Sequence, residues 1–289
     1  MTASASAADP ARTKRARQPL NLFGAIGLSL LAINVLLALF GSFLAPNTVS
    51  ALVGGGAFAP PHDMAVLGND YLGRDLLSRL LNGAKYSLGI AFVASCLGFL
   101  MGMAVGFSAA EIRGRFDMAA TWIIDVLLSF PPILLALLVI AGLGSSIPIL
   151  VGTIAFIQTP RVARVSRAVA MNIAALEFVE VARARGETLF SVLAREIFPN
   201  SLRPLAVEFG LRLSYAVLFM SSLSFLGLGI QPPEPDWGSM VRENLSGLYY
   251  GAPAAIFPAA LIGLLVVGIN LTVDWLSAGA DRHVSEELR

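Results

Sequence analysis

The most informative group of chemically active side chains in this sequence lies in one polar segment, Glu177–Asn200. It carries alternating acids and bases such as Glu180 and Arg183, followed by Gly186 and Pro199. The segment stands between long apolar runs, and a charged side chain at the centre of a bilayer costs about 2.5–3.5 kcal/mol on insertion scales. It must therefore lie in water or against a partner protein, so the predicted chemistry is recognition of a partner.

Side chains typical of catalysis or nucleotide binding are sparse. The two histidines, His62 and His283, lie outside the apolar runs and far along the chain from Cys96, the single cysteine. The only lysines are Lys14 and Lys85, and the G-x-x-x-x-G-K-[ST] phosphate loop is missing from the sequence. We therefore predict a chain that is not an enzyme, has no catalytic or metal-binding residues and binds no cofactor itself. If its work is driven by ATP, the ATPase is another polypeptide.

The composition is that of an integral membrane protein. Of the 289 residues, 56% are hydrophobic and only 13% are charged. Soluble domains have about 25% charged and 45–50% apolar residues. The net charge of +1 comes from clustered charges and gives no reason to expect a nucleic-acid partner, whereas membrane lipids must surround the chain.

A helix that spans a bilayer needs about 20 mostly apolar residues. Six segments reach or approach that length: Leu22–Leu44, Tyr86–Ala109, Met118–Leu143, Ile147–Ala170, Leu205–Ile230 and Ala254–Leu276. The fourth is the weakest, because Arg161, Arg164 and Arg167 occupy its second half, where they could meet lipid headgroups or an ATPase. We predict an all-α, polytopic fold with about six transmembrane helices.

The distribution of basic residues predicts cytoplasmic N- and C-termini, because cytoplasmic loops of membrane proteins are enriched in Lys and Arg. The expected organisation is a disordered basic tail (1–20), a first transmembrane helix (21–45), an outer segment with an amphipathic helix (46–85), a core transmembrane domain (86–281) and a cytoplasmic tail (282–289). The core contains a cytoplasmic loop (171–200) and an outer loop (231–253).

Two features are expected at the outer face. Leu72, Leu76 and Leu80 recur every four residues, and Arg74 and Asp75 fall off that stripe, which predicts an amphipathic helix at the membrane interface. In the second outer segment, Trp237 is expected as an interfacial anchor, since Trp favours the membrane–water boundary.

The cytoplasmic segment is expected to form a helix–turn–helix finger. Val179, Ala182, Gly186 and Leu189 share one helical face, and their small, apolar character suits close docking of a partner. Gly186 permits a turn that other residues resist. A second short helix should follow and end before Pro199, because the residue preceding proline avoids the helical region.

Several motifs together resemble a known family. Glu180–Gly186, with Pro199 thirteen residues later, resembles the "EAA" loop of ABC-importer permeases. Three further segments, Leu67–Gly83, Asp125–Pro131 and Leu223–Gly238, resemble the C-type inner-membrane permease of the dipeptide, oligopeptide and nickel branch. The likeness covers nearly the whole chain; its departures from the pattern are Val181 in place of alanine and Phe198 in place of leucine.

The resemblance implies a permease subunit of an ATP-driven importer in the bacterial inner membrane. It would form one translocation pathway with a second, B-type permease, above two cytoplasmic ABC ATPase subunits that bind ATP and Mg. A periplasmic or lipid-anchored substrate-binding protein would deliver the ligand. Di- or oligopeptides are the expected substrates, with nickel complexes, opines and glutathione as alternatives. The rival class is an ATP-independent channel or secondary transporter, which predicts broken helices in matching halves.

The resemblance assigns the coupling loop, and residue types and positions suggest candidates for two further roles. The ATPase-coupling loop would include Glu177, Glu180, Ala182, Gly186, Leu189 and Pro199. Candidates for the pathway or its gate are Asp125, Arg212 and Ser222, with structural alternatives: a hydrogen bond for Asp125, an i,i+4 pair with Glu208 for Arg212, and helix packing for Ser222. Candidates for contact with the binding protein are Arg74, Asp75 and Trp237.

Overall fold

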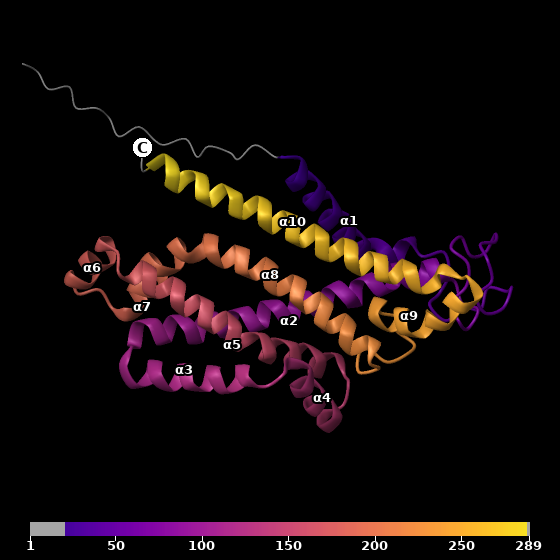
Figure 1. The fold of residues 1–289 in the computed structure, drawn as a ribbon, viewed down its shortest axis with the longest axis horizontal. Coiled ribbons are helices and arrows are strands. Elements are labelled where there is room, and N and C mark those ends of the chain that lie inside the picture. The colour runs from indigo at the N-terminus through magenta and orange to yellow at the C-terminus, as the bar shows by residue number, and fades with distance from the viewer. Residues whose placement is uncertain (1–20, 288–289) are drawn as a thin grey trace, which may run out of the picture.

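The computed structural model describes residues 21–287, so the predicted basic tail, 1–20, lies outside the described residues. The described chain is an elongated helical bundle in which only isolated β-bridges occur, all in the outer segment (Figure 1). Its helices are α1 (Leu22–Leu44), α2 (Leu76–Ile112), α3 (Gly114–Ser129), α4 (Pro132–Leu143), α5 (Ile147–Ala174), α6 (Glu177–Ala184), α7 (Leu189–Ser191), a π-helix (Val192–Ile197), α8 (Phe198–Phe225), α9 (Trp237–Asn244), two 3₁₀ helices (Leu245–Tyr250 and Pro253–Ala255) and α10 (Ile256–Glu287).

The polar finger (Glu177–Asn200) and the polar segment before α2 lie at opposite ends of the bundle (Figure 1). Helices α2, α5 and α8 run through its middle, α1 and α10 lie together on one side, and α3 lies on the other (Figure 1). Helices α6 and α7 form one end, and α9 with the segment before α2 forms the other. By length and composition, four helical stretches of the described chain can cross a membrane, or five if the bent pair α3 and α4 counts as one. The predicted six are not reached by this criterion; α5, with three arginines, is not among the four.

The predicted third span is broken, which corrects the expectation of one helix over Met118–Leu143. Helices α3 and α4 meet at an angle of 86°. The break falls at Phe130, which has the extended conformation (φ −82°, ψ 136°) and precedes Pro131 and Pro132. A residue before proline is pushed out of the helical region, and Pro132 then begins the next helix, where its missing N–H is harmless.

Helix α8 continues through Pro199, contrary to the expectation that Pro199 ends the finger. A π-helix precedes it, and the N–H of Phe198 donates to the carbonyl of Leu193, five residues back. Pro199 then occupies the first turn of α8, where a helix tolerates a residue without an N–H. The finger is therefore connected to a long central helix without an intervening loop.

A row of glycines joins α2 to α5. Gly98, Gly102 and Gly106 recur every four residues along α2 and face α5. A Cβ atom added at Gly98 would lie 2.7 Å from the carbonyl oxygen of Ala155, and one at Gly102 would lie 2.5 Å from Cβ of Val162. Small residues let helix backbones approach closely in membranes, so this G-x-x-x-G-x-x-x-G spacing fixes the central contact of the bundle.

Candidate functional site

The finger has the turn that the sequence predicts at Gly186. Gly186 has φ +78° and directly follows the end of α6. Its N–H donates to the carbonyl of Arg183 (2.9 Å), and the N–H of Glu187 donates to that of Ala182 (3.3 Å). This pair of bonds is a Schellman motif, in which a left-handed glycine ends the helix. Thr188 then begins α7, its side chain accepting from the N–H of Ser191.

The face predicted to dock a partner is buried inside the finger itself. Val179 and Ala182 are fully buried. They belong to an apolar cluster that includes Val192 and Ile197 of the π-helix and Ala174 of α5. The expectation that Ala182 meets a partner is therefore wrong for this structure: the chain folds back at Gly186, so the inner face of α6 packs against the returning segment. Ala182 supports the finger from within.

The opposite face of the finger is apolar and free. Phe190 is 79% exposed, Val181 is 53% exposed, and Phe178 and Leu189 are also exposed. Glu177 and Glu180 are exposed beside them. We call the exposed residues Phe178, Val181, Leu189 and Phe190 the free face. Leu189 was predicted to dock, whereas Phe178, Val181 and Phe190 were not, although the i, i+3 spacing of Phe178 and Val181 was a visible signal.

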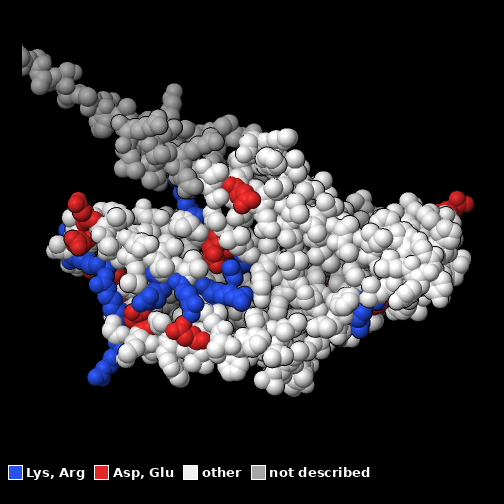
Figure 2. Space-filling model, in the orientation of Figure 1, with Lys and Arg blue, Asp and Glu red and all other residues white. Residues whose placement is uncertain are grey.

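Arginines of α5 pair with acids of α3 (Figure 2). Arg164 donates to Asp125 at 2.5 Å, with both side chains more than half exposed, and Arg167 donates to both oxygens of Asp117 at 2.5 and 2.6 Å. The sequence offered lipid or an ATPase as contacts of the arginines, but two of them bind within the chain. Asp125 thus has the polar partner that a structural role requires, although the pair stays open on one side.

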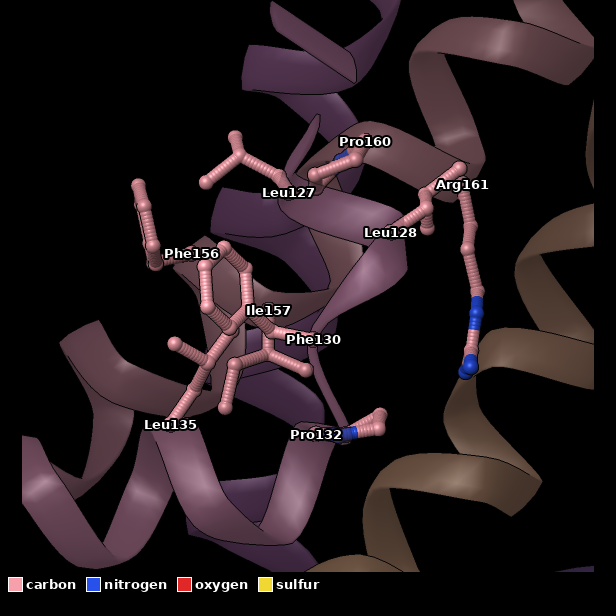
Figure 3. A pocket seen from close by; sticks show the side chains of 9 residues that line it. All are labelled: Leu127, Leu128, Phe130, Pro132, Leu135, Phe156, Ile157, Pro160 and Arg161. Atoms are coloured by element: carbon pink, nitrogen blue, oxygen red, sulfur yellow. The ribbon is translucent and has the colours of Figure 1, made fainter. Parts of the chain in front are cut away.

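Arg161 differs from the other arginines of α5. Its guanidinium lies 5.0 Å from the ring centre of Tyr215 on α8, a cation–π contact. Near it, Phe130 of the α3–α4 break lies beside Ile157, and the Arg161 side chain extends away from both (Figure 3). The hollow between the α3–α4 break and α5 has a volume of only about 10 Å³, room for at most one water molecule. The side chains of the break therefore pack closely against α5.

Two further pathway candidates have defined surroundings. The predicted pair of Arg212 and Glu208 forms at 2.8 Å, with both side chains largely buried. Ser222 is exposed and donates to the carbonyl of Leu218 one turn back. It lines an open, mostly apolar hollow of about 430 Å³ together with Phe225 and Val241.

The end of the bundle that α9 and the segment before α2 form (Figure 1), which the sequence predicts to be the outer end, is held by a buried cluster of charges. Arg74 and Arg79 contact Asp70 at 2.7 and 3.4 Å, and Arg79 contacts Glu243 of α9 at 2.9 Å. The two cations and two anions balance, as a buried charge requires. Burial raises the pKa of the Glu243 carboxyl, and the nearby arginines oppose that rise.

The three residues predicted to meet a binding protein, Arg74, Asp75 and Trp237, are instead buried at this end of the bundle. Asp75 is the N-cap of α2 and accepts from the N–H groups of Leu77 and Ser78, so the helix begins at Leu76 and the predicted interfacial helix does not form. Trp237 is fully buried and donates to the carbonyl of Leu80 (3.0 Å), so it is not an interfacial anchor. With Arg74 buried too, none of the three side chains is placed for direct contact with a partner.

Comparisons with known proteins agree on one family. Residues 94–286 match the family model described as "Binding-protein-dependent transport system inner membrane component". The chain is 38% identical over 215 residues to the glutathione transport system permease protein GsiD of Pectobacterium atrosepticum, covering 74% of this chain and 71% of that protein. It is 35% identical over 268 residues to a putative peptide transport system permease protein of Brucella suis, covering 91% and 88%.

Solved structures with the same fold include ABC-transporter membrane chains. A chain of the MetNI methionine ABC transporter in an inward-facing conformation aligns with a TM-score of 0.58 and 21% identity, over 69% of this chain and 95% of that one. A chain from the crystal structure of an amino acid ABC transporter with histidines aligns with a TM-score of 0.53 and 20% identity, over 70% of this chain and 93% of that one. At this level of identity the likeness concerns the fold.

Proposed function

Because the chain belongs to the family of binding-protein-dependent transport system inner membrane components, we propose that it is the C-type permease of an ATP-driven peptide importer. It is a multi-pass protein of the bacterial inner membrane, and its role is transport rather than catalysis. In the proposed complex, a second, B-type permease completes the pathway and two ABC ATPases bind ATP and Mg. A periplasmic or lipid-anchored binding protein delivers substrate.

The free face of the finger is the observation that carries this proposal. It exposes two phenylalanines at the end of the bundle, on a segment whose acidic residues cannot enter lipid. Exposed apolar clusters of this kind mark surfaces where proteins meet. We propose that an ATPase covers Phe178 and Phe190, with Glu177 and Glu180 at the rim of the interface.

The mechanism follows from how the finger is built. Its buried inner face makes α6 and the π-helix one rigid unit, and that unit runs directly into α8. Movement of a docked ATPase would therefore displace the cytoplasmic end of α8 along with the finger. Docking can shift the equilibrium between two conformations of the bundle only by the difference in the ATPase's affinity for them. We propose that ATP binding supplies that difference and hydrolysis removes it.

Peptides are the substrate class that the relatives favour. The two relatives described above are named for glutathione, a tripeptide, and for peptides. Nickel complexes and opines remain alternatives within the branch. The ATP-independent rival requires broken helices in matching halves, whereas the α3–α4 break has no counterpart among the described helices.

We propose that the α3–α5 face meets water or the second permease, and that α1 meets lipid. Asp125 and Arg164 are 56% and 59% exposed, and charged side chains at membrane depth face a protein or a water-filled cavity. Helix α1 exposes apolar residues such as Leu36 and Phe43. These two faces give the bundle a polar side and a lipid side.

Accessibility of introduced cysteines tests that assignment. In a Cys96→Ser background, Asp125→Cys in the assembled complex should react with a charged methanethiosulfonate reagent at least about ten-fold faster than Leu36→Cys, because the reactive thiolate forms only where water reaches. Leu36 is a suitable control since it is 53% exposed on a helix without charged residues. Equal rates at both positions would show that water does not reach the α3–α5 face in the assembled complex, which leaves only the second permease as its neighbour.

Reconstitution tests the function as a whole. The complex of both permeases and both ATPases, in proteoliposomes with the binding protein, should take up labelled dialanine or glutathione only when ATP is supplied. Uptake of both without ATP would favour the channel or secondary transporter. Uptake of neither peptide, with ATP hydrolysis intact, would remove the proposed substrate class.

A further inference from the structure

We infer that the ion pair between Arg183 and Glu111 is the strut through which the finger acts on the α2–α3 elbow, so that Arg183 is a positioning residue for coupling. The elbow is the short connection Ile112–Gly114 between α2 and α3. This inference rests on the proposed function, because it assigns a route for the motion that an ATPase would impart to the finger.

The geometry of the strut is specific. One guanidinium nitrogen of Arg183 donates to the Glu111 carboxylate at 2.7 Å, and the other donates to the carbonyl of Ala174 at 3.4 Å. The side chain of Glu111 is only 8% exposed and that of Arg183 33%. The bond joins residues 72 positions apart, so it connects the finger to a different part of the fold.

Side chains of α6 and of the end of α2 make this connection, and the Arg183–Glu111 pair is its charged part. The inner face of α6 shares an apolar cluster with Phe107 and Ala110 at the end of α2, and the Arg183–Glu111 pair lies beside that cluster. The long Arg183 side chain reaches Glu111 at the last turn of α2. Since Glu111 is nearly buried, removing its partner would leave an uncompensated charge, which is much more costly than losing an exposed pair. A displacement of α6 must therefore either carry Glu111 along or break the bond.

The elbow itself is held in an unusual conformation. Arg113 has φ +56° and ψ −167°, a region that is almost reserved for glycine. Such a conformation persists only where the surrounding structure over-determines it. Two ion pairs do so here: Glu111 binds the finger on one side, and Asp117, in the first turn of α3, binds Arg167 of α5 on the other. The elbow is thus held by one ion pair to the finger and by another to α5.

Charge exchange tests the strut in the reconstituted complex. The variants are Glu111→Arg, Arg183→Glu and the double exchange, and the quantity measured is peptide taken up per ATP hydrolysed. Each single reversal should lower this ratio about ten-fold, within the usual range of coupling factors, with ATP hydrolysis retained. The double exchange should restore it to within about three-fold of the wild type, and Arg183→Lys should keep most of it, because both preserve the opposite charges.

The control and the outcomes separate coupling from folding. Arg115→Glu applies the same reversal to an exposed residue next to the elbow and should leave the ratio unchanged. A wild-type ratio in both single variants would overturn the inference. Loss of complex assembly in the single variants, restored or not by the exchange, would also overturn it, since the pair would then be structural only. If the wild-type complex does not couple ATP to uptake, the proposed function itself fails.

Discussion

Replacing Gly106 by alanine is expected to destabilise the bundle by about 1–3 kcal/mol, the usual cost of overpacking a well-packed core. The added Cβ would lie 2.8 Å from the backbone nitrogen of Arg167 and closer still to the carbonyl oxygen of Ala163. Both atoms belong to the backbone of α5, so no side-chain rotation can relieve the contact. The two central helices would have to separate, and the neighbouring Arg167–Asp117 pair would be displaced.

Gly89→Ala is the matched control, because Gly89 lies on the same helix and a Cβ there would meet nothing within 4 Å. Thermal unfolding of the detergent-solubilised protein should show a lower midpoint for Gly106→Ala than for Gly89→Ala. If the two variants unfold at the same temperature, the close approach of α2 and α5 is not what holds the bundle together.

Replacing Phe190 by glutamate is expected to abolish most ATPase binding while the permease stays folded. Phe190 is largely exposed, so the substitution buries no charge within the chain. In the proposed interface, an aromatic side chain would enter a pocket of the ATPase. Loss of such an anchor typically costs about 2 kcal/mol or more, which corresponds to at least about thirty-fold weaker binding.

Asn172→Glu is a suitable control for the added charge, since Asn172 is exposed near the end of α5, before the finger begins. The ATPase retained on the purified permease, together with the thermal midpoint of the permease, gives the result. Retention of equal ATPase by Phe190→Glu and Asn172→Glu would mean that the free face is not the docking surface.

Local signals in the sequence were sufficient for several features. The low charge content and long apolar runs indicated a membrane protein, and the glycine at position 186 indicated the turn that the structure has. The pair of Glu208 and Arg212 was predictable because residues four apart on a helix are neighbours. The α3–α4 break could also have been predicted from Pro131 and Pro132, but the apolar composition across them favoured one continuous span.

The tertiary structure decided what covers each face. Helical periodicity placed Val179 and Ala182 together, but only the return of the chain onto α6 made theirs the buried face and left Phe178 free. In the same way, Trp237 carries an interfacial residue type, yet packing against α2 buries it.

Ion pairs between residues far apart in the sequence could not be predicted either. The partners Glu111 and Arg183 are 72 residues apart, and Asp125 and Arg164 are 39 apart. Sequence spacing predicts contacts only within one helix, where geometry relates neighbours. The sequence indicated a polar finger and where that finger turns. Which side of the finger is exposed, and which helix its Arg183 contacts, depends on how separate helices pack, so only the folded bundle decides it.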